Sequence, residues 1–425
     1  MQKMLTACFL GALNVCIWSF FWPALHQLSY FYSNSSIVLS TRLNSRFFFR
    51  GGFTATFEVI AKTGNHEQVV FCHDPDVGLK AIIALHNTTL GPALGGTRMW
   101  NYANEDEALT DVLRLSKGMT YKAAAAGLNL GGGKAVIIGD SKTQKTEGLF
   151  RAFGQFVNSL NGKYITAEDV GTSEQDMEYI YMETPWVTGI SKDFGGSGDP
   201  SPYTAHGVLM GIKASVHEKS GSDSLKGLRI AVQGLGNVGF NLVKYLDQEG
   251  TKIIVSDIDP EKIKKIKDLY PTAEAVAPTE ILSVQCDVLA PCAMGAIVNE
   301  KTIASFKTPI ICGGANNQLL ELRHGNALEE MGILYAPDYI VNAGGLMNVF
   351  VELEGYSQSR AFDKTKRVYD NLKQVYKIAK RDKIPTYLAA DRLAEERIKM
   401  VTKLKQKHPG KSNRAFTTLR EINNR

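Results

Sequence analysis

The sequence predicts an α/β fold in two domains, and three observations support this prediction. The chain has 425 residues, a length at which two or three domains are expected. Short apolar and β-branched runs alternate with patterns of helical period along most of its length. Residues 228–257 combine both patterns as a strand, a glycine-rich turn, a helix and a second strand, which is the unit of a parallel sheet with crossover helices.

The charge distribution argues against a nucleic-acid partner. Residues 1–50 contain three arginines and one lysine but no Asp or Glu, and they contribute +4 of the net charge of +5. The remaining 375 residues are therefore close to neutral and give no basic surface of the kind that binds nucleic acid. The six cysteines include no CxxC pair and no histidine cluster completes a zinc site, so we expect reduced thiols and no metal.

The N-terminal segment has a different composition from the rest. Met4–Leu25 is almost wholly apolar and long enough to span a bilayer, and Ser33–Arg50 is rich in Ser and Arg and free of acids. Three interpretations stay open: a membrane anchor, a targeting peptide, or a start codon assigned too far upstream. We place residues 1–51 outside the fold. We expect a cytoplasmic protein, with membrane contact only if this extension is real.

Strands are expected at 67–74, 79–87 and 135–140, where β-branched and apolar residues are bounded by turn residues. Asn104 with Glu107 three residues later is typical of a helix start, and Gly127 is typical of a helix end. A further helix precedes residue 161. The apolar faces of the two helices are Ala108, Leu109, Val112, Leu113 and Ser116, and Leu149, Phe150, Phe153, Val157 and Leu160.

In the second half of the sequence we expect one helix, then the 228–257 unit, then three more strands at a spacing that fits a parallel sheet. The chain ends in a helix that follows Pro385. The additional helix and strands are 201–218, 286–292, 308–314 and 333–341, and the apolar face of the last helix is Ala390, Leu393, Ala394, Ile398 and Val401.

Gly234, Gly236 and Gly239 form a GxGxxG pattern at the turn of the 228–257 unit. In this context the first glycine permits a tight turn, the second lets a pyrophosphate approach the backbone, and the third lets helix and strand pack closely. The phosphates would then meet the N–H groups at the start of the helix. The alternative is a glycine-rich turn that binds nothing.

Asp257 ends the second strand of this unit, where a carboxylate can accept a hydrogen bond from a ribose 2′-hydroxyl. The next residues are Ile258 and Asp259 rather than an arginine that would bind a 2′-phosphate. The pattern therefore favours NAD over NADP.

Six motifs occur in order along the chain, and one of them places a lysine directly after three glycines. Together they resemble the Glu/Leu/Phe/Val amino-acid dehydrogenases, and most closely the members that act on leucine. The resemblance runs from Glu58 to Arg397. The motifs are GPALGGTRMW (91–100), RLSKGMTYKAAAAGLNLGGGKAVI (114–137), YITAEDVGT (164–172), VQGLGNVG (232–239), GGANNQL (313–319) and VNAGGLMNV (341–349).

The resemblance implies roles for three charged residues. Lys134 matches the catalytic lysine, Lys122 matches the lysine that binds the substrate α-carboxylate, and Asp169 matches the acid that moves protons to and from the amino group. Before the resemblance, a surface ion-pair set was an equal alternative. Two ammonium groups near one buried site disfavour each other's charge. We expect one lysine, held by a carboxylate, to stay cationic while Lys134 becomes neutral and acts as a base.

The implied mechanism transfers the substrate Cα hydride to NAD, after which Lys134 activates a water that attacks the iminium ion and Asp169 helps to expel ammonia. We expect a dry cleft between the two domains, where the glycines of residues 131–133 let the substrate lie against bare backbone.

The family register supplies the other predicted site residues. Those near the substrate are Leu94, Gly95, Gly96, Met119, Ala167, Asn316, Asn317, Leu346 and Val349. Those near the cofactor are Thr204, Gly234, Leu235, Gly236, Asn237, Val238, Gly239, Asp257, Ile258, Cys292 and Ala293.

The predicted substrates are L-leucine and other branched-chain L-amino acids, converted reversibly to 2-oxo acids and ammonia. In the glutamate enzymes a lysine stands where Leu94 does, and an apolar wall cannot compensate burial of a distal carboxylate. An aromatic amino-acid dehydrogenase and a catalytically silent NAD-binding protein remain alternatives.

The family also implies a homo-oligomer, with an octamer as one form. The predicted domains are a substrate-binding and oligomerisation domain at 52–190, a Rossmann NAD-binding domain at 191–385, and a helical segment at 386–425 that returns to the first domain.

Overall fold

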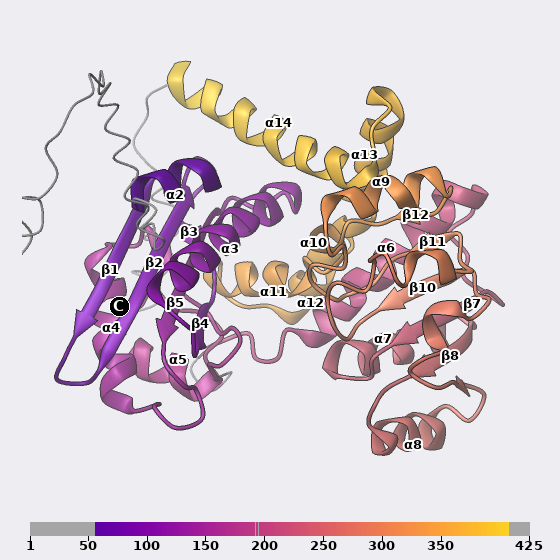
Figure 1. The fold of residues 1–425 in the computed structure, drawn as a ribbon, viewed down its shortest axis with the longest axis horizontal. Coiled ribbons are helices and arrows are strands. Elements are labelled where there is room, and N and C mark those ends of the chain that lie inside the picture. The colour runs from indigo at the N-terminus through magenta and orange to yellow at the C-terminus, as the bar shows by residue number, and fades with distance from the viewer. Residues whose placement is uncertain (1–55, 192, 194, 408–425) are drawn as a thin grey trace, which may run out of the picture. The chain divides into compact units, whose positions relative to one another are not determined.

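Two six-stranded sheets organise the part of the chain that the structure describes (Figure 1). The computed structural model describes residues 56–191, 193 and 195–407. The predicted N-terminal extension at 1–51 and residues 408–425 of the predicted C-terminal helical segment lie outside these residues. The α/β fold class predicted from the sequence is confirmed.

The first sheet is mixed and has the strand order β1-β2-β5-β3-β6, with β4 paired to β5. β1 and β2 are antiparallel, as are β2 and β5, whereas β3 and β4 run parallel to β5. The strands are β1 (Gln68–Asp74), β2 (Leu79–Asn87), β3 (Ala93–Leu94), β4 (Thr97–Trp100), β5 (Gly131–Ile138) and β6 (Tyr164–Ile165).

Helices cover both faces of the first sheet. Alternate residues of β2 point to opposite faces, so Ile82 packs with Leu109 of α3 and Ile83 packs with Phe153 of α4. Burial on both faces explains why the sequence of β2 is almost continuously apolar. The helices of this part are α2 (Thr56–Thr63), α3 (Glu105–Ala125), α4 (Glu147–Ser159) and α5 (Glu174–Tyr181).

The helix boundaries predicted for α3 are confirmed. The Asn104 side chain accepts a hydrogen bond from the Glu107 N–H, so it caps the first turn. At the other end Gly127 has φ +73°, a conformation that glycine adopts without strain.

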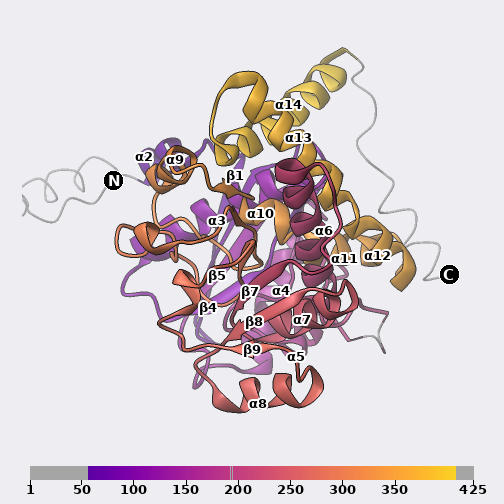
Figure 2. The same ribbon diagram turned by 90° about the vertical axis from the view of Figure 1, so that its right-hand side faces the viewer.

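The second sheet is parallel throughout, in the order β12-β11-β10-β7-β8-β9. This is the Rossmann-type architecture that the 228–257 unit predicted. Figure 2 labels β7, β8 and β9 of this sheet. Its strands are β7 (Arg229–Gln233), β8 (Lys252–Ser256), β9 (Glu274–Ala275), β10 (Val288–Pro291), β11 (Ile310–Ile311) and β12 (Leu334–Tyr335). The helical segments around it are α6 (Ser201–Ser220), α7 (Asn237–Gln248), α8 (Pro260–Leu269), α9 (Leu322–Glu330), η3 (Ile281–Ser283) and η4 (Ile303–Ser305).

The predicted strand at 333–341 is wrong in its second half. Only Leu334–Tyr335 forms β12, and Asp338–Val341 forms the short helix α10. Pro337 has no N–H to continue the strand ladder, and the Asp338 carboxylate accepts hydrogen bonds from the N–H groups of Gln318 and Tyr339. These bonds turn the chain away from the sheet.

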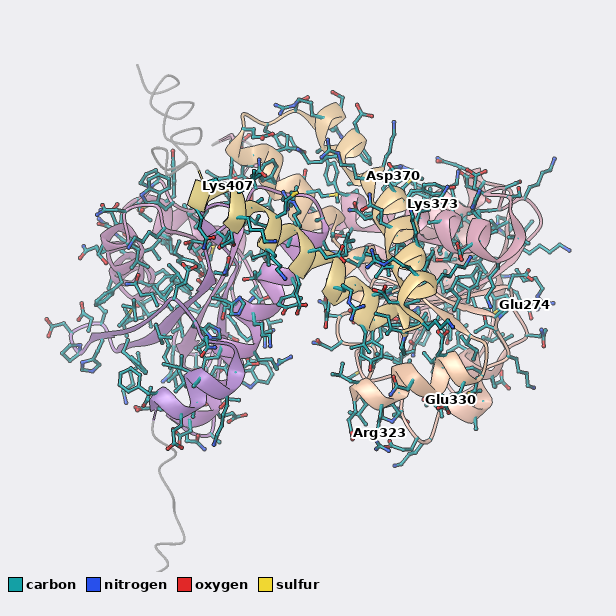
Figure 3. The ribbon with its side chains drawn as sticks, turned by 90° about the horizontal axis from the view of Figure 1, so that it is seen from above. Glu274, Arg323, Glu330, Asp370, Lys373 and Lys407 are labelled. Carbon is teal, nitrogen blue, oxygen red and sulfur yellow. The ribbon has the colours of Figure 1, made fainter. Side chains whose placement is uncertain are left out.

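Four helices follow in the described part of the chain: α11 (Gly344–Leu353), α12 (Gln358–Thr365), α13 (Arg367–Asp382) and α14 (Thr386–Lys407). α13 packs on α6, which lies beside the second sheet. α14 packs on α3, which covers the first sheet. Figure 3 looks down on α14 and shows Lys407 at its end on the side of the first sheet. No helix in the described ranges is long and apolar enough to cross a membrane.

Candidate active site

Lys134 and Asp169 form an ion pair in which the lysine is buried and the carboxylate is 23% exposed. The Lys134 Nζ lies 3.0 Å from the Asp169 Oδ2, and Lys134 is only 5% exposed. Lys134 lies in the middle of β5, and Asp169 lies in the segment after β6. β4 brings them together, because its Thr97 pairs with Ala135 on one side and bridges Glu168 on the other. This juxtaposition agrees with the predicted catalytic pair.

Gly96 makes the approach of Asp169 possible. A Cβ at Gly96 would lie 2.4 Å from the Glu168 carbonyl oxygen and 2.9 Å from the Asp169 Cβ. Gly95 is equally constrained, because a Cβ there would lie 1.8 Å from the Gly133 carbonyl oxygen. Both glycines therefore have a packing reason in addition to the predicted approach to substrate.

The interpretation of Gly131, Gly132 and Gly133 as room for the substrate is wrong. All three lie inside β5, and protein atoms occupy the space where each Cβ would project. At Gly132 the Cβ would lie 2.1 Å from the Thr120 N of α3, and at Gly133 it would lie 2.7 Å from the Tyr164 ring. The glycines let α3 and the Tyr164 ring pack directly on the backbone that carries Lys134.

Lys122 reaches from α3 to the second sheet. Its Nζ donates a hydrogen bond of 2.7 Å to the Asn342 Oδ1, and the Asn342 Nδ2 donates one of 2.7 Å to the Asn316 Oδ1. The predicted carboxylate-binding lysine and the predicted amide Asn316 are thus joined through a residue that the sequence analysis did not select. Asn317 next to Asn316 has φ +51° and is exposed.

Burial changes the protonation of both lysines. It lowers the pKa of Lys122 to about 8; the Asp338 charge raises this pKa, and the Lys134 charge lowers it further. Burial also lowers the pKa of Lys134, while the charge of Asp169 and its hydrogen bond oppose this effect. For Asp169, burial alone would raise the pKa, but Lys134 and Arg98 together hold it below its ordinary value.

The predicted partnership of the lysines is therefore wrong in one respect. The carboxylate contacts Lys134, the proposed base, whereas the partner of Lys122 is the neutral amide of Asn342. Among the described residues, Lys134 therefore has a carboxylate as its bonded partner, whereas Lys122 has only a neutral amide. Lys122 is the lysine left to bind an added anion such as a substrate carboxylate.

Arg98 and Asn342 are site residues that sequence reasoning missed. The Arg98 Nε lies 3.0 Å from the Asp169 Oδ2, on the same oxygen that Lys134 contacts. Both residues belong to motifs that were quoted for other members, Arg98 beside Gly96 and Asn342 beside Leu346. The signal that could have identified Arg98 and Asn342 is that each is a polar side chain inside one of the quoted motifs.

The glycine-rich turn of the second sheet has the geometry that a dinucleotide requires. Gly234 has φ +92°, and a Cβ at Gly239 would lie 1.9 Å from the Gly234 carbonyl oxygen. At Gly236 no heavy atom of the described residues lies within 4 Å of the Cβ position. No side chain in the described part caps α7, which begins at Asn237, so its first N–H groups are free to bind phosphate.

Asp257 is held at the end of β8 beside this turn. Its Oδ2 accepts from the Leu235 N–H at 2.6 Å and its Oδ1 from the Asp259 N–H at 2.9 Å. Ile258 is 89% exposed. A pocket of about 290 Å³ is lined by the turn and by Lys262 of α8. These residues fit NAD, with the pyrophosphate at α7 and a ribose at Asp257.

The remaining predicted cofactor residues support the turn or lie near it. The Cys292 N–H donates to the Gln233 carbonyl at 2.7 Å, and Ala293 fills the space over Gly234. The Thr204 hydroxyl donates to the Pro200 carbonyl at 3.1 Å, within the first turn of α6. Val238 is partly buried against the main core. No cluster of His, Cys, Asp or Glu in the described ranges could hold a metal ion.

Two family comparisons cover most of the described chain. Residues 66–186 match the Glu/Leu/Phe/Val dehydrogenase dimerisation domain, and residues 195–405 match the Glutamate/Leucine/Phenylalanine/Valine dehydrogenase domain. The chain belongs to the Glu/Leu/Phe/Val dehydrogenase family. The dimerisation domain implies that it assembles as a homo-oligomer.

Individual members of the family are similar over nearly their whole length. The leucine dehydrogenase of Geobacillus stearothermophilus is 58% identical over 342 residues, which are 80% of this chain and 93% of that protein. The phenylalanine dehydrogenase of Caldalkalibacillus thermarum is 51% identical over 355 residues, 83% of this chain and 95% of that protein. The crystal structure of L-tryptophan dehydrogenase from Nostoc punctiforme matches with a TM-score of 0.74 and 48% identity, covering 82% of this chain and 99% of that one.

The residues that the family register assigns to the substrate side chain are apolar and mostly buried. Leu94 and Leu346 are 2% and 7% exposed and share one hydrophobic cluster, against which Val349 and Met119 pack. Ala167 is 8% exposed just after β6. No residue of this set carries a charge.

Proposed function

We propose that this protein catalyses the NAD-dependent, reversible oxidative deamination of L-leucine and other branched-chain L-amino acids to 2-oxo acids and ammonia. The observation that carries the proposal is the ion pair of buried Lys134 with Asp169, close enough to Lys122 for both charges to act on its pKa. The 58% identity to a leucine dehydrogenase supports the choice of substrate.

NAD, when bound, accepts the hydride from the substrate Cα. The chain's own contribution begins with Lys122, whose ammonium binds the α-carboxylate in place of the Asn342 amide that it now contacts. Asn342 and Asn316 are then free to bind the same carboxylate or to orient it. Anchoring one end of the substrate fixes the position of its α-carbon over Lys134.

Loss of the hydride leaves an iminium ion at the α-carbon, and the next step adds water to it. Neutral Lys134 takes a proton from this water as the new C–O bond forms, which gives a carbinolamine. Asp169, 3.0 Å from the Lys134 Nζ, receives that proton and delivers it to the amino group. The C–N bond breaks, ammonia leaves, and the hydroxyl proton is lost as the 2-oxo acid forms.

The apolar lining favours aliphatic substrates over glutamate. Leu94 stands where the glutamate enzymes carry a lysine, so a distal carboxylate would be buried without a counter-ion at a cost of several kcal/mol. One methylene contributes only about 1–3 kcal/mol, so leucine, isoleucine and valine are all expected to react. An aromatic substrate is the second candidate, because a phenylalanine dehydrogenase is 51% identical.

A substrate panel tests the proposal. NADH formation is measured with leucine, isoleucine, valine, phenylalanine, tryptophan and glutamate, each with NAD and with NADP. We expect the highest kcat/KM for a branched-chain substrate with NAD. A higher value for phenylalanine or tryptophan would reassign the enzyme to aromatic substrates, and no turnover with any of the six would leave an NAD-binding protein without this chemistry.

We further propose an octamer and a cytoplasmic location for the protein, both of which follow the family register rather than a contact within the chain. Light scattering on purified protein gives the mass of the assembly. A mass of eight chains supports the octamer, and any smaller stable mass contradicts it. Recovery in the membrane fraction of the native host would contradict the location.

A further inference from the structure

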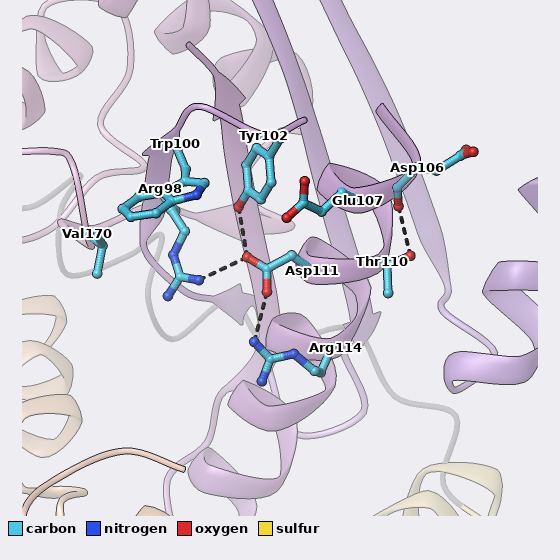
Figure 4. A pocket seen from close by; sticks show the side chains of 9 residues that line it. All are labelled: Arg98, Trp100, Tyr102, Asp106, Glu107, Thr110, Asp111, Arg114 and Val170. Atoms are coloured by element: carbon cyan, nitrogen blue, oxygen red, sulfur yellow. Dashed lines mark hydrogen bonds and ion pairs between the residues drawn. The ribbon is translucent and has the colours of Figure 1, made fainter. Parts of the chain in front are cut away.

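Arg98 contacts the Asp169 carboxylate on one side and lines a pocket on its other side. The pocket has a volume of about 620 Å³ and is lined by Arg98, Trp100, Tyr102, Asp111 and Arg114, among others (Figure 4). On the inner side the Arg98 Nε contacts the Asp169 Oδ2 at 3.0 Å, and on the pocket side its Nη1 contacts the Asp111 Oδ2 at 2.9 Å.

The strand register explains why Arg98 is in this position. β4 pairs with β5 so that Arg98 is opposite Val136. Gly96, two residues before Arg98, is therefore beside Lys134, two residues before Val136. Residues two apart on a strand point to the same face, so the Arg98 and Lys134 side chains project from the same face of the sheet. Gly96 between them has no side chain that could separate the two from Asp169.

One oxygen of Asp169 therefore has two cationic partners. Lys134 and Arg98 both contact the Oδ2 at 3.0 Å. The guanidinium keeps its charge at every pH at which the enzyme works, whereas the ammonium can lose a proton. When Lys134 becomes neutral, Arg98 is the partner that still compensates the charge of Asp169.

Asp111 holds Arg98 in turn. Its Oδ2 accepts from the Tyr102 hydroxyl at 2.8 Å as well as from Arg98, and its Oδ1 accepts from Arg114 at 2.8 Å. Figure 4 shows these three bonds converging on Asp111. A guanidinium fixed at both ends cannot swing away from Asp169 without breaking this network.

We propose that Arg98 is a positioning residue: it fixes the Asp169 carboxylate and keeps a permanent positive charge beside the Lys134–Asp169 pair, so that the proton leaves Lys134 more readily. The inference deepens the proposed function, on which it rests. The proposed role of Arg98 is exerted through Asp169.

The charges around the pair agree with this role. They come from Lys134 on β5, Arg98 on β4, Lys122 and Asp111 on α3, and Asp338 on α10, which acts on Lys122. Burial lowers the pKa of Lys134, Asp169 raises it, and the charge of Arg98 lowers it again. Without Arg98, the proton shared by Lys134 and Asp169 would be held more tightly.

The test is the pH dependence of kcat/KM for leucine in three variants. Arg98→Met removes the charge, Arg98→Lys keeps it, and Arg114→Ala is the matched control, since Arg114 also binds Asp111 but makes no contact with Asp169. We expect the acid limb of the Arg98→Met profile to move up by about one pH unit. Arg98→Lys should restore most of this shift, and the Arg114→Ala profile should coincide with the wild-type profile.

A purely structural role for Arg98 predicts a different result, in which Arg98→Met loses activity equally at all pH values without a shift of the limb. That outcome, or an equal shift in Arg114→Ala, would overturn the proposal. A second measurement is independent of turnover: acetic anhydride labels neutral lysine, and peptide mass spectrometry follows the labelling of Lys134 against pH.

The midpoint of this labelling should rise in Arg98→Met as well. An unchanged midpoint would contradict the inference even if leucine were not the substrate. If the wild-type protein fails to oxidise any amino acid but the labelling midpoint shifts as expected, the proposed function fails while the positioning role stands.

Discussion

Lys134 combines two properties that a base in this reaction needs: its side chain is buried, and its only charged partner at bonding distance in the described chain is Asp169. Replacing it by alanine removes the base and leaves the carboxylate. We expect Lys134→Ala to lower kcat by at least about 100-fold, the range in which a positioned base contributes. NAD affinity should not change, because the cofactor turn lies on the other sheet.

Steady-state kinetics and NAD titration by fluorescence measure these two quantities, with Lys163→Ala, an exposed lysine of the same domain, as the control. A kcat near the wild-type value in the Lys134 variant would remove Lys134 from the mechanism. A simultaneous loss of NAD binding would instead indicate that the variant is misfolded.

We expect Lys122 to make substrate binding depend on pH. Its pKa is lowered to about 8 in the free enzyme, so above this pH its cationic form, the form that binds a carboxylate, becomes the minority. The affinity for 4-methylpentanoate, which has the carboxylate and side chain of leucine without the amine, should therefore fall about tenfold per pH unit above that value. Below it the affinity should be constant.

The inhibition constant measured from pH 6 to pH 10 checks this expectation. Lys122→Arg is the informative variant, because a guanidinium stays charged throughout and should give a flat profile. A flat profile in the wild-type enzyme would mean that the charge of Lys122 is not what binds the carboxylate.

At the scale of elements, the contact between β5 and α3 sets the distance between the two lysines. Gly132 is where the strand meets the helix: an alanine Cβ would lie 2.1 Å from the Thr120 N and 2.6 Å from the Ser116 carbonyl oxygen, both backbone atoms. Gly132→Ala must therefore push α3 away. We expect a loss of about 1–3 kcal/mol or more in the free energy of unfolding, and an activity loss larger than the loss of folded protein explains.

Gly118→Ala is the matched control. Gly118 lies in α3 itself, is exposed, and has no atom of the described residues within 4 Å of its Cβ position. There the substitution should stabilise the helix by about 0.5–1 kcal/mol. Thermal melts and kcat of the two variants compare the effects, and equal melting temperatures would show that the strand–helix contact is less tight than the structure has it.

At the scale of the whole molecule, α14 binds the C-terminal end of α3, the helix that carries Lys122. The Arg397 Nη1 donates to the carbonyl oxygens of Ala124 at 3.1 Å and Leu128 at 2.6 Å, and the Nη2 donates to the Asn129 Oδ1 at 3.0 Å. These are the acceptors at the C-terminal end of α3, where a cation also meets the negative end of the helix dipole.

Arg397→Ala should therefore loosen the end of α3. We expect a loss of about 2 kcal/mol in stability and faster amide hydrogen exchange in residues 122–129, together with a higher KM for leucine through Lys122. Arg392→Ala in the same helix is the control: Arg392 pairs with Asp382 at the surface and should change stability by less than about 0.5 kcal/mol. Equal exchange rates in the two variants would contradict the role of Arg397.

Much of the fold could be predicted from local sequence. The apolar run of β2, the Asn104 cap of α3 and the glycine turn before α7 each depend on a few consecutive residues, and the structure confirms all three. The helix in the second half of 333–341 could not be predicted from local sequence. It depends on the hydrogen bond that the Asp338 carboxylate accepts from the Gln318 N–H, 20 residues away.

For the candidate site, the sequence by itself determined which residue types are present and in what order, and hence the family and the positions of Lys122, Lys134 and Asp169 in its motifs. Only the tertiary structure decided their partners. In the folded chain Asp169 pairs with Lys134 and Arg98, and Lys122 donates a hydrogen bond to Asn342. The space beside Gly132 is occupied by α3 rather than by substrate. The physical reason is that motifs and periodicity are local, whereas charge pairing and close packing depend on atoms that come together only when distant segments fold against each other.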